Sequence, residues 1–253
     1  MTFNSFFSIL IKVMNHKLIL RIVLPILFLL LACNIYSQRI LGAVSAGMNL
    51  SQVDGDEKYG FKKVGLNIGP SVIIPFGKNR KWSVTMELLF SQLGSRQKEQ
   101  YSNDTIADTT TSEYYDGYKL KLTYVQIPVM VHFKDKNIIA GGVGLSYGQL
   151  VGAQEWEDYN DSRGLFKVET TTLRSPYTLS DLKVVADIRL RLYQRLWFNF
   201  RYSYSILKIR TRDFVNPIYH DVETRQQYNN VITLRLTYIF NEQISKKTGE
   251  QEK

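Results

Sequence analysis

Charged residues that alternate with apolar ones are the residues of this chain best placed to do chemistry. Seven of them, two acidic and five basic, stand on the polar side of a strict alternation: Glu87, Lys183, Asp187, Arg189, Arg191, Arg201 and Arg235. If these side chains line a narrow interior, isolated charges would be costly there, so they are expected to pair or to reach water. We interpret them as a salt-bridge network that fills a lumen, and the alternative is a basic passage for small anions.

Residues 196–206 indicate which kind of element positions these charges. One set of alternate residues, from Leu196 to Ile206, is apolar or aromatic throughout, whereas the other becomes polar after Trp197 and includes Arg201. Strict alternation over this length indicates an extended strand with different surroundings on its two faces. We predict that the aromatic face points into lipid and that Arg201 points inward.

Eight segments with this alternation follow one another along the chain. They are residues 40–50, 64–76, 82–90, 118–133, 139–151, 182–192, 196–206 and 230–240. In the fourth segment the apolar residues change parity after Tyr124, which predicts a bulge near residues 126–128. In the fifth segment one face is rich in small residues, including Gly142 and Gly144, which predicts a strand that makes room for large neighbours.

The connections between these segments alternate in length. Short turns at 77–80, 134–137 and 193–195 alternate with long polar connections at 51–63, 91–117, 152–181 and 208–229. An even number of strands with this alternation is typical of outer-membrane barrels, and each segment supplies the roughly 9–11 residues that a tilted membrane strand needs. We therefore predict an all-β fold, an eight-stranded antiparallel transmembrane β-barrel. Four aromatic residues of the long connections are expected to cap the barrel mouth or to meet a partner: Trp156, Tyr159, Phe166 and Tyr177.

The two ends of the chain are predicted to lie outside the barrel. Residues 1–37 have the basic region, the short apolar run and the small polar end of a secretory signal peptide, and Met14 is an alternative start. The apolar run is too short for a comfortable spanning helix of about 20 residues. Residues 38–240 form the predicted barrel and residues 241–253 a charged periplasmic tail. Lipidation of Cys33, the one cysteine, is the alternative form of processing.

Two motifs carry a family resemblance: Glu-Leu-Leu-Phe-Ser-Gln-Leu-Gly at 87–94 and Tyr-Val-Gln-Ile-Pro at 124–128. They resemble the PorT-like outer-membrane β-barrel family of Gram-negative bacteria, and the chain departs from that family at Gln126, where an acidic residue is common. The residues that match the family motif are Glu87, Gln92, Gly94, Tyr124, Ile127 and Pro128. The aromatic end of the last strand resembles the signal that barrel-assembly machinery reads, and its residues are Tyr238 and Phe240.

The first expectation for function is a non-enzymatic scaffold or interaction protein in the outer membrane of a Gram-negative bacterium. The resemblance implies an accessory part in a type IX-like protein secretion system, with protein partners bound through the outer loops or the C-terminal tail. Outer-membrane lipid and the barrel-assembly machinery are the other expected partners. The net charge of +9 is spread along the chain, which argues against a nucleic-acid partner. The alternatives are a narrow channel for small solutes or anions and an outer-membrane lipid-modifying enzyme.

Residue spacing gives little support for catalysis or metal binding. Outside the predicted signal there are two histidines, His132 and His220. We interpret His132 as a residue of the periplasmic rim, and a pairing of His220 with Ser203 or Ser205 is the basis of the enzyme alternative. Four residues have part of a calcium-loop spacing without the glycine that such a loop needs: Asp158, Asn160, Ser162 and Glu169. No catalytic residue, cofactor or metal is expected.

Overall fold

The computed structural model describes residues 40–56, 60–77, 79–98, 100–106, 109–115, 117–161, 164–171, 176–215, 222–240 and 242. They belong to one compact unit, Arg39–Lys253, and all their regular secondary structure is β-strand. In this part of the chain no helix is long and apolar enough to cross a membrane. The predicted signal peptide with Cys33, and the tail beyond Glu242, lie outside the described residues.

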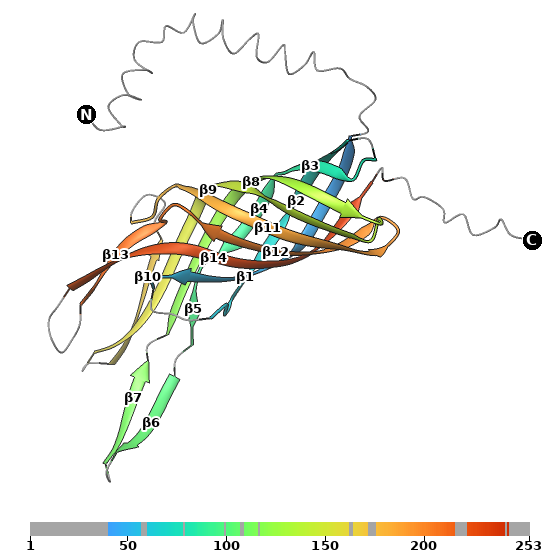
Figure 1. The fold of residues 1–253 in the computed structure, drawn as a ribbon. Coiled ribbons are helices and arrows are strands. Elements are labelled where there is room, and N and C mark those ends of the chain that lie inside the picture. Colours follow the sequence, from blue (N-terminus) through green and yellow to red (C-terminus); the bar gives the residue numbers. More distant parts are fainter. Residues whose placement is uncertain are drawn as a thin grey trace, which may run out of the picture. The chain divides into compact units, whose positions relative to one another are not determined.

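The barrel wall has eight positions, and the third is divided between two strands. In chain order they are β1 (Leu41–Asp54), β2 (Lys63–Phe76), β3 (Trp82–Glu87) with β4 (Leu89–Leu93), β8 (Tyr118–Asp135), β9 (Ile139–Asp161), β11 (Ser180–Tyr193), β12 (Leu196–Ser205) and β14 (Val222–Ile239). Each position pairs antiparallel with the next one along the chain. β14 also pairs with β1, from Ala43↔Ile239 to Asp54↔Tyr228, which closes the ring (Figure 1). The predicted eight-stranded antiparallel barrel is confirmed.

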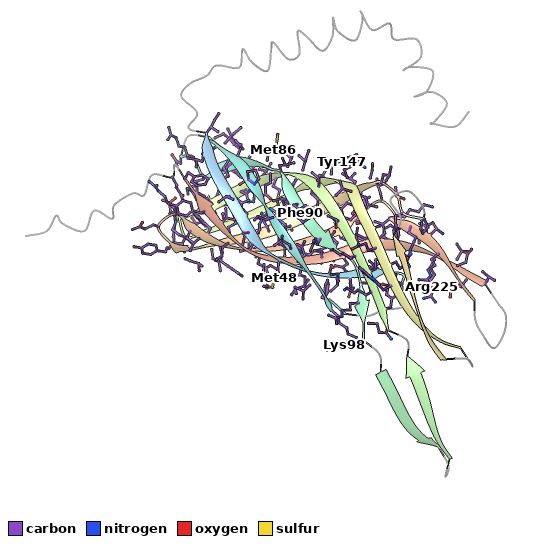
Figure 2. All side chains as sticks on the ribbon, turned by 180° about the vertical axis from the view of Figure 1, so that it is seen from behind. Met48, Met86, Phe90, Lys98, Tyr147 and Arg225 are labelled. Atoms are coloured by element: carbon purple, nitrogen blue, oxygen red, sulfur yellow. The ribbon has the colours of Figure 1, made fainter. Side chains whose placement is uncertain are left out.

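Side chains of the wall alternate between the lumen and an apolar outer surface. On β12, Phe200 and Tyr202 are each 42% exposed, whereas Arg201 between them is 4% exposed. Both faces of this strand are therefore oriented as predicted. The same alternation on the other wall strands leaves large apolar side chains exposed all around the barrel, and Figure 2 shows Met48 and Met86 projecting from this surface. An exposed apolar band around a closed barrel is the surface that such proteins present to lipid.

Aromatic rings gather at the short-turn end of the apolar band. The ring centroids of Trp82 and Phe133 are 5.0 Å apart, and those of Tyr238 and Phe240 are 5.5 Å apart. Aromatic side chains form girdles of this kind where an outer-membrane barrel meets the membrane interface. The rings therefore mark one boundary of the membrane-spanning part.

The prediction of a bulge near residues 126–128 of β8 is wrong. Alternation along β8 is unbroken, and every even-numbered residue from Tyr118 to His132 is buried on the lumen side. The first four of these side chains are apolar because the outer half of the lumen is itself packed with apolar groups. The change along the strand is thus a change in what fills the lumen, not a change of face. A register shift does occur against β9, between Thr123 and Tyr124.

The connections are short at one end and long at the other, but the long ones are not simple loops. The short turns have left-handed backbone at Arg80, Asn137 and Gln194. The long connections contain five further strands: β5 (Arg96–Gln97), β6 (Gln100–Ile106), β7 (Thr109–Tyr115), β10 (Gly164–Thr171) and β13 (Arg210–Val215). β6 pairs with β7, β10 with β9 and β13 with β14, so hairpins extend from this end (Figure 1). Pairing gives the backbone groups partners, and the Thr, Tyr and Val residues of these segments favour strands.

Small residues on the lumen face of β9 make room for large side chains of β8, as predicted. Gly142 lies directly opposite His132, and a Cβ atom on Gly142 would lie 2.2 Å from Cδ2 of that ring. A Cβ atom on Gly144 would lie 2.1 Å from the carbonyl oxygen of Val129. The neighbouring Gly141 faces outward and has nothing within 4 Å of the same position.

Gly142→Ala is expected to destabilise the barrel, whereas Gly141→Ala is expected to be neutral or slightly stabilising. The added methyl group meets the ring of His132, which hydrogen bonds hold in place, and overpacking of this kind costs about 1–3 kcal/mol. The measurement is the free energy of unfolding by urea from lipid vesicles. Equal stability of the two variants would show that the ring moves aside freely.

Candidate functional site

One carboxylate at the centre of the lumen bridges three guanidinium groups. Glu87 is the last residue of β3, faces inward by the alternation of that strand and is 2% exposed. Arg201 donates two hydrogen bonds to its carboxylate, both 2.9 Å long, and Arg235 donates two more of 2.9 and 2.7 Å. Nη2 of Arg189 lies 3.3 Å from Oε1 of Glu87. Paired charge-assisted hydrogen bonds are among the strongest that side chains make, so this centre ties β3 to β11, β12 and β14 across the lumen.

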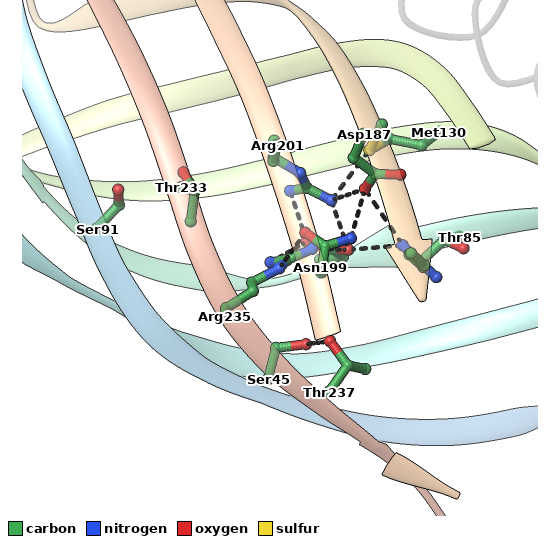
Figure 3. A network of polar contacts seen from close by, with 12 residues as sticks. Ser45, Thr85, Ser91, Met130, Asp187, Asn199, Arg201, Thr233, Arg235 and Thr237 are labelled. Atoms are coloured by element: carbon green, nitrogen blue, oxygen red, sulfur yellow. Dashed lines mark hydrogen bonds and ion pairs between the residues drawn. The ribbon is translucent and has the colours of Figure 1, made fainter. Parts of the chain in front are cut away.

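Asp187 of β11 is a second acidic centre beside the first (Figure 3). Its Oδ2 accepts a hydrogen bond of 2.8 Å from Arg201 and one of 3.1 Å from Asn199. Its Oδ1 lies 2.8 Å from Nε2 of His132, whose Nδ1 lies 3.1 Å from the hydroxyl oxygen of Thr85. The two centres therefore form one buried network with contributions from five wall positions.

His132 belongs to this network, so its interpretation as a residue of the periplasmic rim is wrong. Its side chain is 1% exposed and contacts Asp187 and Thr85 inside the barrel. The unbroken alternation of β8 turns it inward, and Gly142 of β9 leaves the space that the ring occupies. The prediction had placed it at the rim because it lies near the end of its strand.

Two of the seven predicted lumen residues lie apart from the central network. Lys183, nearer the hairpin end, forms an ion pair of 3.2 Å with Asp181, and its ammonium lies 5.0 Å from the ring centroid of Tyr124. Arg191 lies at the short-turn end, with its guanidinium 4.4 Å from the ring centroid of Trp197. The structure thus distributes the predicted charges over three levels of the lumen instead of one cluster.

Glu242 closes the short-turn end of the lumen. Its carboxylate accepts hydrogen bonds from Arg191 and from Nε1 of Trp197, the latter 3.1 Å long, and it lies 3.6 Å from the ammonium of Lys134. The side chain is 6% exposed, so the start of the predicted tail is bound to the barrel. A cavity of about 50 Å³ lies against Glu242 and Arg189, and a volume of this size holds only a few water molecules.

Apolar side chains close the opposite end of the lumen. They form one buried cluster of Val53, Leu93, Tyr118, Leu120, Leu122, Tyr124, Leu150, Ala153, Tyr177, Ile209 and Val231. Tyr177, one of the four aromatic residues expected at the mouth, caps the barrel as part of this cluster. Trp156, another of the four, instead packs against the ammonium of Lys119, 4.5 Å from its ring centroid. The side chains of Tyr159 and Phe166 lie outside the described residues.

A second polar cluster, which we call the outer clasp, consists of Glu155, Arg210, Tyr118 and Tyr177. Nη1 of Arg210 donates hydrogen bonds of 3.0 and 2.9 Å to the two carboxylate oxygens of Glu155. The hydroxyl groups of Tyr118 and Tyr177 donate to the same oxygens at 2.6 and 2.7 Å. Nε of Arg210 donates to Gln227 at 2.7 Å. The clasp therefore joins β8, β9, β13 and β14 beyond the apolar band.

The residue spacing did not predict the outer clasp. Glu155 and Arg210 are 55 residues apart and lie in segments interpreted as polar loops. The alternation of β9 changes phase at Val151, where its register against β8 also shifts, so Ala153 and Glu155 face inward although the earlier alternation would turn both outward. This change of phase is why the alternation did not locate Glu155. Although burial by itself raises the pKa of the Glu155 carboxyl, the hydrogen bond from Tyr118 and the charge of Arg210 hold that pKa below its ordinary value.

The residues of the family motif occupy different surroundings. Glu87 is the centre of the lumen network, and Tyr124 and Pro128 face the lumen, whereas Ile127 is exposed on the apolar band. Gly94 has a φ of +136°, and a Cβ atom there would lie 2.1 Å from the carbonyl oxygen of Leu120. Gln92 pairs with Thr123 of β8. Tyr238 and Phe240 both face outward.

The enzyme and calcium alternatives each include a residue, His220 and Ser162 respectively, that lies outside the described residues. Ser203 and Ser205 are buried in the lumen, and Ser205 donates a hydrogen bond of 3.0 Å to Asp181, whereas His220 lies outside the described residues. Asp158 and Glu169 lie on the two paired strands β9 and β10, with Asp158 opposite Lys167. No group of three or more His, Cys, Asp or Glu side chains among the described residues is placed to hold a metal ion.

Comparison with known proteins places the fold among outer-membrane barrels. Residues 37–210 match the model of a family described as outer membrane protein beta-barrel domain. Ail of Yersinia pestis, in complex with the heparin analogue sucrose octasulfate, is 13% identical over 79% of this chain and 99% of its own, with a TM-score of 0.40. The outer membrane protease OmpT from Escherichia coli is 9% identical over 80% and 94%, with a TM-score of 0.41. A major outer membrane protein from Thermus thermophilus is 11% identical over 80% and 100%, with a TM-score of 0.38. No curated protein matches the chain.

Glu87→Gln is expected to destabilise the barrel strongly. The substitution removes the charge that faces three buried guanidinium groups, and breaking a buried ion pair from one side costs about 3–5 kcal/mol. The measurement is the free energy of unfolding by guanidinium chloride from lipid vesicles. The matched control is Glu223→Gln, which removes an exposed carboxylate paired with Arg225 and is expected to change stability little. Similar values for both variants would contradict a central role of Glu87.

The outer clasp is expected to lose its stabilising effect in acid. Because the pKa of Glu155 is lower in the folded protein, its contribution is complete above the ordinary value of 4.5 and is lost as pH falls through the folded-state value. The thermal midpoint of the wild type should therefore exceed that of Glu155→Gln at about pH 7, and the difference should shrink towards about pH 3. Both chains keep the lumen carboxylates, so the difference isolates Glu155. A difference that does not vary with pH would contradict this reasoning.

Proposed function

The chain belongs to the outer membrane protein beta-barrel domain family, and from this membership we propose that it is a non-enzymatic scaffold or interaction protein. It is an integral protein of the outer membrane of a Gram-negative bacterium. In barrels of this kind the short turns face the periplasm and the long connections face the exterior. The hairpins of β6–β7, β9–β10 and β13–β14 are therefore the parts available to partners outside the cell.

The observation that carries the proposal is the filling of the lumen at every level. Glu242 and Trp197 lie at the periplasmic end, the network around Glu87 lies in the middle, and the apolar cluster lies at the outer end. A solute would have to separate buried ion pairs and then displace packed apolar side chains, and both steps are costly. This arrangement supports a protein that acts through its ends, and it weighs against the channel alternative.

The hairpins offer a suitable surface for protein partners. β6 and β7 form a two-stranded sheet of their own, paired with each other and with no other described strand. A two-stranded hairpin leaves both of its outer edges with unpaired backbone groups, and an extended partner segment can add to such an edge. Binding by strand addition therefore needs no pocket in the barrel itself.

We further propose that the protein is PorT-like and accessory to a type IX-like secretion system. Support comes from the motifs at 87–94 and 124–128, whose residues include the central carboxylate Glu87 and the buried Tyr124. The exposed pair Tyr238 and Phe240 fits a contact with barrel-assembly machinery during insertion. Glu242 anchors the start of the predicted tail at the periplasmic mouth. We propose the tail as a second part that binds periplasmic partners.

Deletion of the gene is expected to leave a class of secreted proteins in the periplasm, measured by quantitative proteomics of secreted, surface and periplasmic fractions. The wild-type gene should restore secretion. A variant in which a short Gly-Ser turn replaces residues 100–115 should insert into the membrane but fail to restore secretion, because it lacks the β6–β7 hairpin. Folded barrel in both strains is measured by the heat-dependent shift of its mobility in gels.

Unchanged secretion in the deletion strain would contradict the secretion role. Steady ion conductance of the purified wild-type protein in planar bilayers would contradict a filled lumen and favour the channel. Lipid turnover by the purified protein, abolished by His220→Ala, would favour the enzyme.

A further inference from the structure

Basic side chains gather on the outward face of the wall just beyond the apolar band. Arg96 of β5 lies directly opposite Lys119 of β8, and Lys121 lies two residues further along the same face of β8. Lys119 is exposed between the buried side chains of Tyr118 and Leu120, which shows that it points away from the lumen. We call Arg96, Lys119 and Lys121 the outer basic patch.

Like charges lie side by side in the outer basic patch. Like charges directly opposite one another on paired strands destabilise a sheet. None of the three residues forms an ion pair with another residue of the described part of the chain. Lys63, at the outer end of β2 beyond the band, has a pKa below its ordinary value, first because of burial and then because of the charges of Lys119, Lys121 and Arg96. An anion bound on this surface would therefore reduce the repulsion between these positive charges.

Trp156 places the outer basic patch at a membrane interface. It lies directly opposite Lys119 on β9, and the ammonium of Lys119 is 4.5 Å from its ring centroid. Amphipathic aromatic rings of this kind are enriched where a barrel meets the headgroups. Below the patch on the same face, Val125 and Val151 are exposed and belong to the apolar band. The row Arg96–Lys119–Trp156 therefore lies at the height of the headgroups of the outer leaflet.

We propose that the outer basic patch binds the phosphate groups of the glycolipid that forms the outer leaflet, the lipid A part of lipopolysaccharide. The patch faces sideways from the wall, on the face that continues into the apolar band, so one ligand can place acyl chains on the band and phosphates on the cations. Arg96 can bind a phosphate through two parallel hydrogen bonds, and the two lysines add point charges. The proposal goes beyond the proposed function, because it concerns lipid and holds with or without a secretion role.

The test compares the full-length protein with Lys119→Gln/Lys121→Gln, in detergent micelles titrated with diphosphoryl lipid A, with native mass spectrometry to count bound lipid. Near an anionic surface each cation contributes about fivefold in affinity, so the double variant should bind lipid A about 30-fold more weakly. The matched control is Lys81→Gln/Lys136→Gln, which removes two exposed lysines at the short-turn end and should bind like the wild type. Lys119→Arg/Lys121→Arg keeps both charges and should also bind.

Folding of each variant is measured by thermal unfolding without lipid A, where loss of the repelling charges should leave the midpoint unchanged or higher. Equal lipid A binding by the Lys119→Gln/Lys121→Gln variant and the control variant would overturn the proposal, because the acyl chains alone would then account for binding. Inorganic phosphate that competes with lipid A at comparable concentration would also overturn it, and would assign the patch to a free anion. Weaker binding of monophosphoryl than of diphosphoryl lipid A would support it.

Discussion

Hydrocarbon offers a peptide group no hydrogen-bond partner, so the wall of this protein can exist only as a closed ring. The pairing of β14 with β1 supplies partners along the seam. A ring of eight positions has an interior just wide enough for side chains, and strand alternation directs every second residue into it. The ion network and the apolar cluster fill that space, and the small residues of β9 leave room for the large side chains within it.

The outer surface could be predicted from the sequence because lipid imposes the same requirement on every residue of that face. The inward orientation of the Arg201 side chain could be predicted from the aromatic residues on either side of it. The partners inside the lumen could not be predicted, because they come from distant strands. Glu87 meets Arg201 and Arg235, which are 114 and 148 residues away in sequence. Alternation specifies the face on which a side chain lies, but not its height in the barrel or its neighbours.

Two predictions failed because the polarity of a segment was taken as evidence for its orientation or its secondary structure. In β8, apolar character was equated with the lipid-facing side, but the outer half of the lumen is apolar as well. In the long connections, polar composition was equated with loop structure, although alternating Ser, Thr and Tyr residues also suit a solvated hairpin. The outer clasp lay inside those segments, where Glu155 and Arg210 carry no spacing that would link them.

The distribution of the central network over the strands has a consequence for the order of assembly. Glu87 stands on the third wall position, whereas Arg189, Arg201 and Arg235 stand on the sixth, seventh and eighth. A sheet that still lacks its last strands leaves this carboxylate without its partners, so the lumen can dehydrate only as the ring closes. Contacts made this late stabilise the finished state more than the folding transition state, and such contacts slow unfolding. The ion pairs of Glu87, which form only when the ring closes, therefore slow the unfolding of the inserted barrel.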